Sequence, residues 1–573
     1  MNNDMSFRFA LPPELRDAVE VAAADWSANQ KVARFWQKDA SLWTNDGEEN
    51  WLGWLDIVER QQQDLATYAE LGAEVETADF QTVLLLGMGG SSLCPEVLSL
   101  TFGQRDGFPE LRIVDSTDPE QVWTVRNEVN LADTLVVVAS KSGSTLEPNV
   151  LKQFFFNEMK NAVGSEEASS HFIAITDPGS KMEQVAKDDG FRYIFYGDPA
   201  IGGRFSALSP FGVVAATLAG LNTEKMLDEA AKAVASAKLE PAENPAVRLG
   251  LLLGTAANAG RDKLTIFTSP EIADLGAWME QLVAESTGKL GKGITPVDRE
   301  AIATLEFYRK DRIFAYIRYA GTADSSQDAK VKAIEAAGHP VVTIEIADLY
   351  EIFGQFFTWE VATSVAGSVM GINPFNQPDV ESAKIETRTL TAAYEETGKL
   401  PAREPVLEGE GFKLYATESY AATLKAAAPA GTLAGYLRAH LSQIHEGDYF
   451  AALAFLPMFA ENEAAIQRLR HKVRDKKRVA TCLGFGPRFL HSTGQDYKGG
   501  PNTGVFLQIT ADHTVDVEIP GQKLTFGVVI DAQAAGDLAV LESRGRRAMR
   551  VHLGVDLAAG LEMLAAAMDE ALW

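Results

Sequence analysis

Leu135-Val-Val-Val-Ala139 is followed without a break by Ser140-Lys-Ser-Gly-Ser-Thr145, and a helical pattern begins near Pro148. A β-branched run that ends in a glycine turn and leads into a helix is typical of a parallel α/β sheet. Four hydroxyls, one ammonium group and the turn amides fall at the start of this helix, where free N–H groups attract anions. A helix cap would need only one such hydroxyl. The stretch therefore predicts a phosphate-binding loop formed by Ser140, Lys141, Ser142, Ser144 and Thr145.

A second loop of the same kind lies earlier, in Leu84-Leu-Leu-Gly-Met-Gly-Gly-Ser-Ser-Leu93, with a helix beginning near Pro95. Glycines let the backbone approach a ligand closely, and we expect Gly90 and Ser91 to contact it. A dinucleotide site is the alternative interpretation. It is disfavoured because the third glycine and an acidic residue about 20 positions further on are not clearly present.

Similar apolar runs recur between helical stretches, which predicts an α/β fold with doubly wound parallel sheets. Two changes of composition, Leu239-Glu-Pro-Ala-Glu-Asn-Pro245 and Thr397-Gly-Lys-Leu-Pro-Ala-Arg-Glu-Pro405, mark the candidate boundaries. We predict a helical lead-in at residues 1–60, sheet domains at 61–245 and 246–400, and an appended C-terminal α/β region at 401–573. In the lead-in, the expected anchors are Trp26, Trp36, Trp43, Trp51 and Trp54. The other predicted strands are Val83–Leu86, Phe172–Thr176, Tyr193–Tyr196, Leu264–Thr268, Ile313–Arg318, Val341–Ile346, Tyr449–Phe455, Val479–Gly484, Val505–Thr510 and Met549–Leu553.

The C-terminal region repeats a pattern of the second domain. Phe314-Ala-Tyr-Ile-Arg318, a helix and the run 336–345 resemble Phe506-Leu-Gln-Ile-Thr510, a helix and the run 543–552. Both read strand, helix, turn, strand. Two unrelated βαβ units and a true duplication remain open as explanations, so the region either completes or duplicates part of the second domain.

Composition restricts the class of function. A chain of 573 residues is too long for one core. Its 79 acidic and 52 basic residues give a net charge of -27, which disfavours nucleic acid and anionic membranes as partners. Cys94 and Cys482 each lie in an apolar run, so we expect buried thiols, with no disulfide and no metal site. With neither a signal peptide nor a membrane span recognisable, a cytoplasmic location is expected.

Three further motifs follow the two loops in the chain: Gly202-Gly-Arg-Phe-Ser206, Ala284-Glu-Ser-Thr-Gly-Lys289 and Phe375-Asn-Gln-Pro-Asp-Val-Glu-Ser-Ala-Lys384. Together and in this order, the five segments resemble the phosphoglucose isomerases, a family built from sugar isomerase (SIS) domains. The last motif departs from the family's pattern at Asn376 and Asp379. The resemblance covers about residues 80 to 390. It implies a sugar-phosphate substrate, no cofactor, and a homodimer.

The resemblance also implies roles for individual residues in aldose–ketose isomerisation. A partly buried carboxylate suits proton transfer between C1 and C2, which indicates Glu285. A guanidinium can stabilise the enediolate without protonating it, which indicates Arg204. For ring opening the candidates are Lys384 and His491, with Gly203 and Gln377 as substrate contacts.

His491 stands at an unusual place in the chain. Bacterial members of the family carry a Leu-His-Ser-x-Gly-Gln segment soon after the Glu-Ser-x-Gly-Lys motif. Here Leu490-His-Ser-Thr-Gly-Gln495 comes after the lysine motif, and the only intervening histidine before residue 400 is His339, which we interpret as structural. The segment from Phe485 is similar to that of the isomerase half of bacterial transaldolase/glucose-6-phosphate isomerase fusions. No (β/α)8-sized block precedes residue 80.

These observations predict reversible isomerisation of glucose 6-phosphate and fructose 6-phosphate. Two alternatives remain open at this point. One is a dual phosphoglucose/phosphomannose isomerase, which would use the same acid–base residues. The other is a non-catalytic sugar-phosphate-binding protein, because SIS domains also serve as effector-binding modules.

Overall fold

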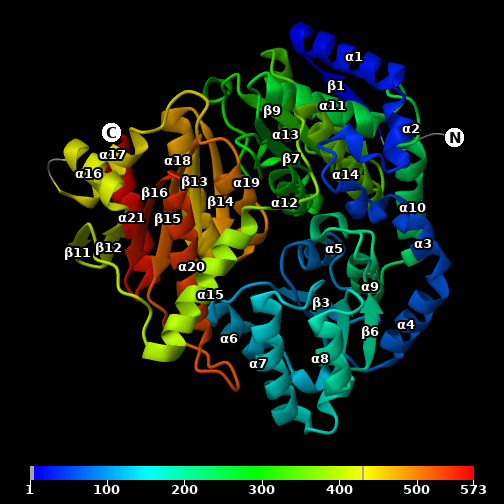
Figure 1. Cartoon of the computed structure of the whole chain (residues 1–573), viewed down its shortest axis with the longest axis horizontal. Helices are drawn as coiled ribbons and strands as arrows, with labels where there is room; N and C mark the ends of the chain where they lie inside the picture. Colours follow the sequence, from blue (N-terminus) through cyan, green and yellow to red (C-terminus); the bar gives the residue numbers. More distant parts are fainter. Residues whose placement is uncertain (1–5, 429–430) are drawn as a thin grey trace.

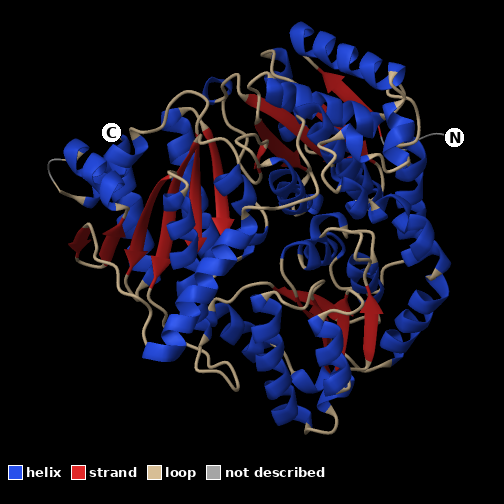
Figure 2. Ribbon diagram, viewed as in Figure 1, coloured by secondary structure: helices blue, strands red, loops and turns tan. Residues whose placement is uncertain are grey.

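The computed structural model describes residues 6–428 and 431–573. Three sheets follow one another along the chain, and helices cover each of them (Figures 1 and 2). The predicted fold class, α/β with doubly wound parallel sheets, is confirmed. None of the helices in these residues has the combination of length and hydropathy that a bilayer-spanning segment requires.

The first sheet has five parallel strands in the order β3-β2-β4-β5-β6. All residues of β2, β4 and β5 are buried, as expected for a sheet covered by helices on both faces. The strand order reverses between β2 and β4, and ligands of such sheets bind at this reversal, beyond the carboxyl ends of the strands. The elements are β2 (Thr82–Leu86), β3 (Glu110–Val114), β4 (Thr134–Ala139), β5 (Phe172–Thr176), β6 (Tyr193–Tyr196), α5 (Leu93–Phe102), α6 (Pro119–Glu128), α7 (Leu146–Val163), α8 (Lys181–Asp189), α9 (Pro210–Leu218) and α10 (Thr223–Ser236).

The second sheet has the order β1-β10-β9-β7-β8, and β1 pairs antiparallel with β10 at one edge. Helix α14 is apolar on nearly all sides and almost completely buried, so it forms the centre of this domain. The elements are β1 (Ser6–Ala10), β7 (Lys263–Thr268), β8 (Thr295–Val297), β9 (Arg312–Tyr319), β10 (Val341–Ile346), α11 (Pro245–Asn258), α12 (Leu275–Thr287), α13 (Ser325–Ala336), α14 (Glu351–Met370) and α15 (Val380–Thr397).

The third sheet lies in the C-terminal region and has the order β11-β12-β16-β15-β13-β14. Helix α15 leaves the second domain and packs along α20 of this region (Figure 1). The elements are β11 (Leu407–Gly409), β12 (Phe412–Tyr415), β13 (Tyr449–Phe455), β14 (Ala480–Phe485), β15 (Gly504–Ala511), β16 (Arg547–Leu553), α16 (Glu418–Ala427), α17 (Leu433–Leu441), α18 (Ala460–Lys477), α19 (Gly494–Gly499), α20 (Phe526–Ser543) and α21 (Leu557–Leu572).

The lead-in consists mainly of helices, but it also contributes strand β1 to the second sheet, which its helical pattern did not predict. Its tryptophans pack on the domains as expected. Trp54 is completely buried against Phe205 and Phe357, and Trp43 Nε1 donates to Ser364 O at 2.8 Å. Trp26 is also buried, whereas Trp36 and Trp51 are partly exposed. The helices are α1 (Pro13–Ala28), α2 (Lys31–Trp36) and α3 (Ile57–Gln63), and α4 (Leu65–Thr77) follows at the start of the first domain.

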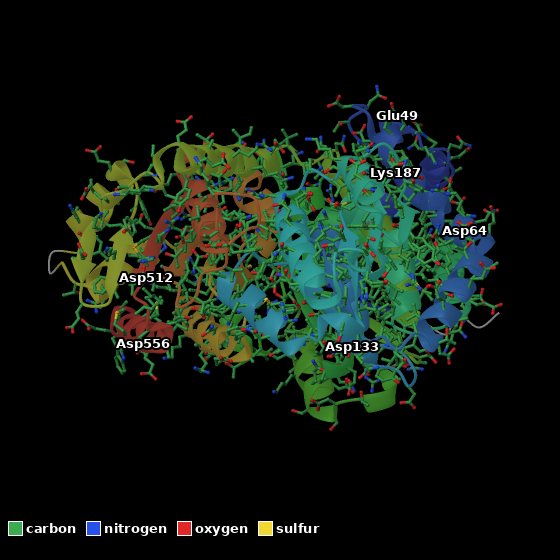
Figure 3. All side chains as sticks on the ribbon, turned by 90° about the horizontal axis from the view of Figure 1, so that it is seen from below. Glu49, Asp64, Asp133, Lys187, Asp512 and Asp556 are labelled. Carbon is green, nitrogen blue, oxygen red and sulfur yellow. The ribbon has the colours of Figure 1, made fainter. Side chains whose placement is uncertain are left out.

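The acidic excess is spread over the molecule. The acidic residues labelled in Figure 3 come from the lead-in (Glu49), the first domain (Asp64, Asp133) and the C-terminal region (Asp512, Asp556). Both cysteines are free and buried, as predicted. An anionic ligand must therefore be held by local donors, because the mean field of the surface repels it.

Candidate active site

A cavity of about 310 Å³ lies where the strand order of the first sheet reverses. It collects residues from six separate motifs of the chain. Twelve of the thirteen residues predicted from the sequence line it: Gly90, Ser91, Ser140, Lys141, Ser142, Thr145, Gly203, Arg204, Glu285, Gln377, Lys384 and His491. The remaining one, Ser144, lines the neighbouring cavity of about 210 Å³ on the other side of Thr145.

Two glycine motifs are packed backbone to backbone at one wall. Gly90 lies in the turn η4 (Gly89–Ser91) and Gly203 in the turn η7 (Gly203–Phe205). A Cβ added to Gly90 would overlap the carbonyl of Gly203, so no larger residue fits without moving the turn. Gly89 has φ +57° and sits against the backbone of His491. These contacts hold the backbone close to any ligand in the cavity.

The hydroxyl loop 140–145 connects β4 to α7. The side chain of Thr145, the N-cap of α7, makes no capping hydrogen bond, and the buried Ser140 Oγ has no partner among the described residues. Unpartnered buried polar atoms on a cavity wall are costly unless a ligand or water satisfies them. The loop therefore offers hydroxyls and helix N–H groups to an anion.

Lys141 also lines the cavity, but its ammonium group is already engaged. Its Nζ donates to Asp177 Oδ1 at 2.8 Å and to Asp198 O at 3.0 Å. Burial lowers the pKa of Lys141, and the charge of Asp177 offsets this only in part. The positive charge that the loop presents to a ligand is therefore smaller than the sequence suggested.

Arg204 is buried and rigidly held. Its Nε donates to Ser286 Oγ at 2.7 Å, Nη1 to Gln377 Oε1 at 3.0 Å, and Nη2 to the carbonyls of Pro374 and Asn376. Burial lowers the pKa of Arg204, and nearby Glu285 partly restores it. One N–H remains on Nη1, the nitrogen that lies 3.6 Å from Glu285 Oε1.

Glu285 lies on α12 and is only 8% exposed. Its second oxygen accepts from Gln281 Nε2 at 3.3 Å, and Gln281, one turn earlier, also lines the cavity. The carbonyl oxygen of Gln281 is buried and has no partner in the described part of the chain. The carboxylate is thus held between an amide and a guanidinium, facing the cavity.

Lys384 reaches the cavity from the first turns of α15. Its ammonium group makes no ion pair within residues 6–428 and 431–573, although its charge helps to lower the pKa of Glu147. Gln377 precedes the helix and is fixed by Arg204. Lys289 donates to both oxygens of Asn376, which explains how asparagine is accommodated at this departure from the family's pattern.

His491 reaches the cavity from the C-terminal region, in the turn η11 (Arg488–His491). Its Nε2 lies 3.0 Å from Glu147 Oε1, and its carbonyl accepts from Gln281 Nε2 at 2.8 Å. Burial acts to raise the pKa of Glu147, but the charge and hydrogen bond of His491 outweigh it, so the net shift is downward. The rearranged order Glu285, Lys384, His491 still brings the three side chains to one cavity.

The chain resembles known proteins over the part that contains most of these motifs. The family model for phosphoglucose isomerase matches residues 46–304. The probable glucose-6-phosphate isomerase of Methanococcus maripaludis is 30% identical over 373 residues, covering 58% of this chain and 82% of that protein. The chain belongs to the phosphoglucose isomerase family. The glucose-6-phosphate isomerase of Rubrobacter xylanophilus is 28% identical over 373 residues, covering 57% of this chain and 86% of its own length.

Solved structures agree on the fold of this phosphoglucose isomerase family member. A hypothetical protein from Thermus thermophilus superposes with a TM-score of 0.59 at 24% identity, covering 68% of this chain and all of its own. A glucose-6-phosphate isomerase from Chlamydia trachomatis gives a TM-score of 0.51 at 22% identity, covering 59% of this chain and 74% of its own. At these identities the likeness concerns the fold alone.

Two residues of the site, Glu147 and Gln281, were not predicted from the sequence. Glu147 follows the hydroxyl loop and has the position of an ordinary first-turn acid, which interacts with the helix dipole. Gln281 looks like one more residue of a buried helix. A weak signal existed for each: Glu147 is two residues after the last loop hydroxyl, and Gln281 is one turn before Glu285.

Proposed function

We propose that this chain interconverts glucose 6-phosphate and fructose 6-phosphate by proton transfer through an enediolate. The observation that carries the proposal is the convergence of Arg204, Glu285, Lys384 and His491 on one cavity beside the hydroxyl loop. No metal or nucleotide is needed for this chemistry, because carboxylate, guanidinium and imidazole groups supply all the proton transfers and charge stabilisation.

In the proposed complex the phosphate lies at the N-terminus of α7. Ser140, Ser142 and Thr145 would donate hydroxyl hydrogen bonds, and Gly90, Ser91 and Gly203 would line the approach. Helix N–H groups add favourable dipoles. Ser144 and Lys141 would contribute indirectly, since Ser144 Oγ lies 2.8 Å from Ser142 Oγ and the Lys141 ammonium bonds Asp177.

Ring opening is assigned to His491 and Lys384. A carboxylate can only accept, so the 3.0 Å contact with Glu147 requires a proton on His491 Nε2. Nδ1 is then the nitrogen that takes the proton of the O1 hydroxyl, and the ammonium of Lys384 delivers one to the ring oxygen. Glu147 itself is held by Gln533 Nε2 at 2.6 Å, which keeps the imidazole oriented.

Isomerisation of the open chain is assigned to Glu285 and Arg204. The Glu285 carboxylate would take the proton from C2 and return it to C1. The remaining N–H of Arg204 Nη1 would stabilise the enediolate oxygen, and a guanidinium cannot protonate that oxygen and quench the intermediate. Gln377 and the unpartnered oxygen of Gln281 would orient the sugar hydroxyls.

We also propose that the chain divides into four parts at residues 60, 245 and 400. The protein is proposed to be cytoplasmic and to form a homodimer. Through the segment that begins at Phe485, we propose that it is related to the isomerase half of transaldolase/glucose-6-phosphate isomerase fusions. The three sheets with their buried free cysteines are compatible with this. Size measurement in solution tests the homodimer.

A coupled assay with fructose 6-phosphate tests the function. Formation of glucose 6-phosphate alone supports the proposal, and additional mannose 6-phosphate would indicate the dual phosphoglucose/phosphomannose isomerase. If neither product forms while the sugar phosphate still binds, the chain is a binding protein. We favour the enzyme because the buried Arg204–Glu285 pair is costly to maintain without a catalytic use.

Replacing Ser140, Ser142 and Thr145 together by alanine should raise KM for fructose 6-phosphate by about 10²-fold or more, since hydrogen bonds to a charged group contribute roughly 1.5–3 kcal/mol each. These hydroxyls hold a group that does not react, so kcat should fall less than KM rises. Steady-state kinetics measure both. Ser419→Ala, at an exposed hydroxyl on α16, is the control. Unchanged binding of inhibitor sugar phosphates would reduce the loop to a helix cap.

Glu147→Gln should keep the shape of the site but remove the negative charge that lies against His491 Nε2. Ring opening should slow by about 10-fold or more, a part of what general acid–base catalysis contributes. Proton exchange in a substrate that is already open should change little. A variant that only disturbed folding would lower the melting temperature and affect both reactions equally, so the two rates and the melting temperature are measured together.

A further inference from the structure

The second and third sheets share one strand order. If the parallel strands of each sheet are numbered one to four in chain order, their spatial order is four, three, one, two in both sheets. These are β10-β9-β7-β8 in the second sheet and β16-β15-β13-β14 in the third. In both, an antiparallel strand pairs with the fourth strand: β1 with β10, and β12 with β16. The likeness therefore extends over five strands of each sheet, with only β11 left without a counterpart, and is greater than that of two ordinary βαβ units.

The helices correspond as well. Helices α12 and α18 follow the first parallel strand of each sheet, α13 and α20 connect the third to the fourth, and α14 and α21 follow the fourth. The helix that directly precedes the first parallel strand is α11 in one sheet and α17 in the other. This order of elements is what a duplication of the second domain would leave.

The two units meet through equivalent elements. Their second strands, β8 and β14, lie side by side at the facing edges, where Cys482 Sγ donates to Pro296 O at 3.5 Å. Gln281 on α12 donates to His491 O in the loop after β14. In return, Arg470 on α18 donates to Asp298 O in the loop after β8, at 2.6 Å. Such reciprocal contacts are typical of two copies related by a twofold axis.

The two equivalent loops differ in chemistry. The loop after β14 presents His491 to the active cavity. The loop after β8 carries Asp298, Arg299 and Glu300 and contains no histidine. Arg299 pairs with Asp274 and Glu463, and Glu300 pairs with Arg312 while accepting from Thr481. Ion pairs within the second unit, the Arg299–Glu463 pair and the Thr481 hydrogen bond to the third unit thus occupy the place where a second site would lie.

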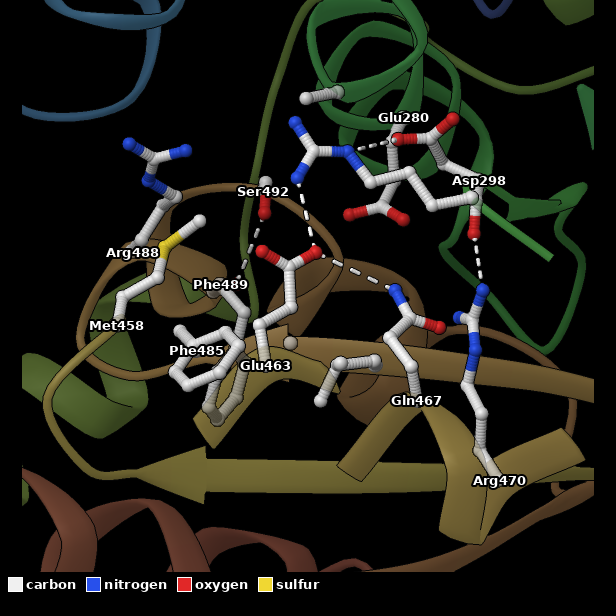
Figure 4. Close-up of a pocket in the computed structure, with 14 residues that line it drawn as sticks. Glu280, Asp298, Met458, Glu463, Gln467, Arg470, Phe485, Arg488, Phe489 and Ser492 are labelled. Atoms are coloured by element: carbon white, nitrogen blue, oxygen red, sulfur yellow. Dashed lines mark hydrogen bonds and ion pairs between the residues drawn. The ribbon is translucent and has the colours of Figure 1, made fainter. Parts of the chain in front are cut away.

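The space left at this second place is too small for a sugar phosphate. The cavity holds about 60 Å³, compared with about 310 Å³ at the active site, which is room for one or two water molecules. Figure 4 shows Glu463 and Gln467 turned toward each other and Arg470 reaching the backbone of Asp298 across it. Only one of the two equivalent places can therefore act on substrate.

The third unit is also fixed to the first domain beside His491. Arg488, three residues earlier and partly buried, binds both oxygens of Glu96 at 2.6 and 2.5 Å and contacts Asp115 at 2.9 Å. Asp115 in turn accepts from Ser92, next to the glycine turn of the active site. Asp379, one of the two departures from the family's pattern, accepts from Gln495 and pairs with Arg544, both in the third unit.

We propose that the C-terminal region is an internal copy of the second domain that occupies the position of a partner chain, so that each chain holds one complete active site and catalysis needs no second chain. The inference rests on the proposed function for its activity readout. It specifies that His491 acts in the same chain as Glu285, and that any dimer of this protein does not complete the site.

Mixing two inactive chains tests this inference. Glu285→Gln and His491→Ala chains are unfolded together, refolded and assayed with fructose 6-phosphate, with each variant refolded alone as the control. We expect the activity of the mixture to be no higher than the sum of the activities of the two variants refolded separately. If the site were shared between chains, random pairing would restore about one quarter of the wild-type activity, because half of the dimers would carry one intact site of two.

A second measurement covers the case in which the chains do not pair. Sedimentation of the wild-type protein at assay concentration shows whether a dimer dissociates. Specific activity is followed over the same dilution series, and we expect the activity per chain to stay constant whether or not a dimer dissociates. Restored activity in the mixture, or activity lost on dissociation, would overturn the inference. A wild-type chain that binds sugar phosphate but shows no turnover would overturn the proposed function instead, so the two failures are distinguishable.

Discussion

Glu285→Gln should lower kcat for fructose 6-phosphate by about 10²–10⁴-fold, the usual contribution of a general base. Glutamine fills the same space, and Gln281 and Arg204 can still contact its oxygen, but it cannot take a proton from carbon. Binding of sugar-phosphate inhibitors should therefore stay close to that of the wild type. Exchange of the C2 proton with deuterated solvent, followed by mass spectrometry, measures the step directly.

Glu280→Gln is a matched control on the same helix. Glu280 lies five residues earlier and faces the small cavity between the second and third sheets instead of the active cavity. Burial raises the pKa of Glu280 to about 8, so at pH 7 its carboxyl group is mostly protonated and glutamine is a close substitute. Its activity should match the wild type. Solvent exchange that persists at the wild-type rate in Glu285→Gln would remove Glu285 from its proposed role.

Most of the sheets could be predicted because their central strands are continuous apolar runs. The runs 135–139, 172–176 and 449–455 are buried on both faces, so they consist almost entirely of apolar residues. The strands that were missed lie at edges or next to them, although the edge strands β6 and β14 were predicted. In β3 the charged Glu110 and Arg112 interrupt the apolar pattern, and β8 is three residues long and contains Pro296, which a central strand would not tolerate.

The residues of the candidate site that belong to a local sequence motif could be predicted. The hydroxyl loop, the two glycine turns and the Glu285 helix are each contiguous in the sequence. Glu147 was missed because its meaning depends on His491, 344 positions away. Lys141 was over-interpreted for a similar reason, since Asp177 and the carbonyl of Asp198 hold its ammonium group and neither could be assigned to it from the sequence.

The assembly of the site depends on tertiary packing that no motif contains. A Cβ on Gly288, in the Glu285 motif, would overlap Asp496, which directly follows the His491 motif. Thr295 donates to Asp496 Oδ2 at 2.9 Å in the same place. Packing against a segment about two hundred residues away thus requires a glycine at position 288 of the Glu285 motif. This contact explains why a histidine so far along the chain can still reach the cavity.

His491→Ala should give the second large loss, and its size should depend on the substrate. Turnover of cyclic glucose 6-phosphate should fall by about 10²–10⁴-fold, because imidazole no longer moves the proton of the O1 hydroxyl during ring opening. Proton exchange at C2 of a four-carbon aldose 4-phosphate should change much less. That sugar cannot close a ring through its phosphorylated oxygen, so it bypasses the step assigned to His491.

His339→Ala separates this role from a structural one. His339 packs edge-on against the rings of Tyr308 and Phe314 beyond the active cavity, and burial lowers its pKa. Its loss should lower the melting temperature and leave the ratio of cyclic to open-chain activity unchanged. His491→Ala should lower the ratio of cyclic to open-chain activity and leave the melting temperature unchanged, because Gln281 still anchors the loop through the backbone carbonyl of residue 491. Equal losses on both substrates at unchanged stability would assign ring opening to another group, and Lys384 would then be the residue to vary.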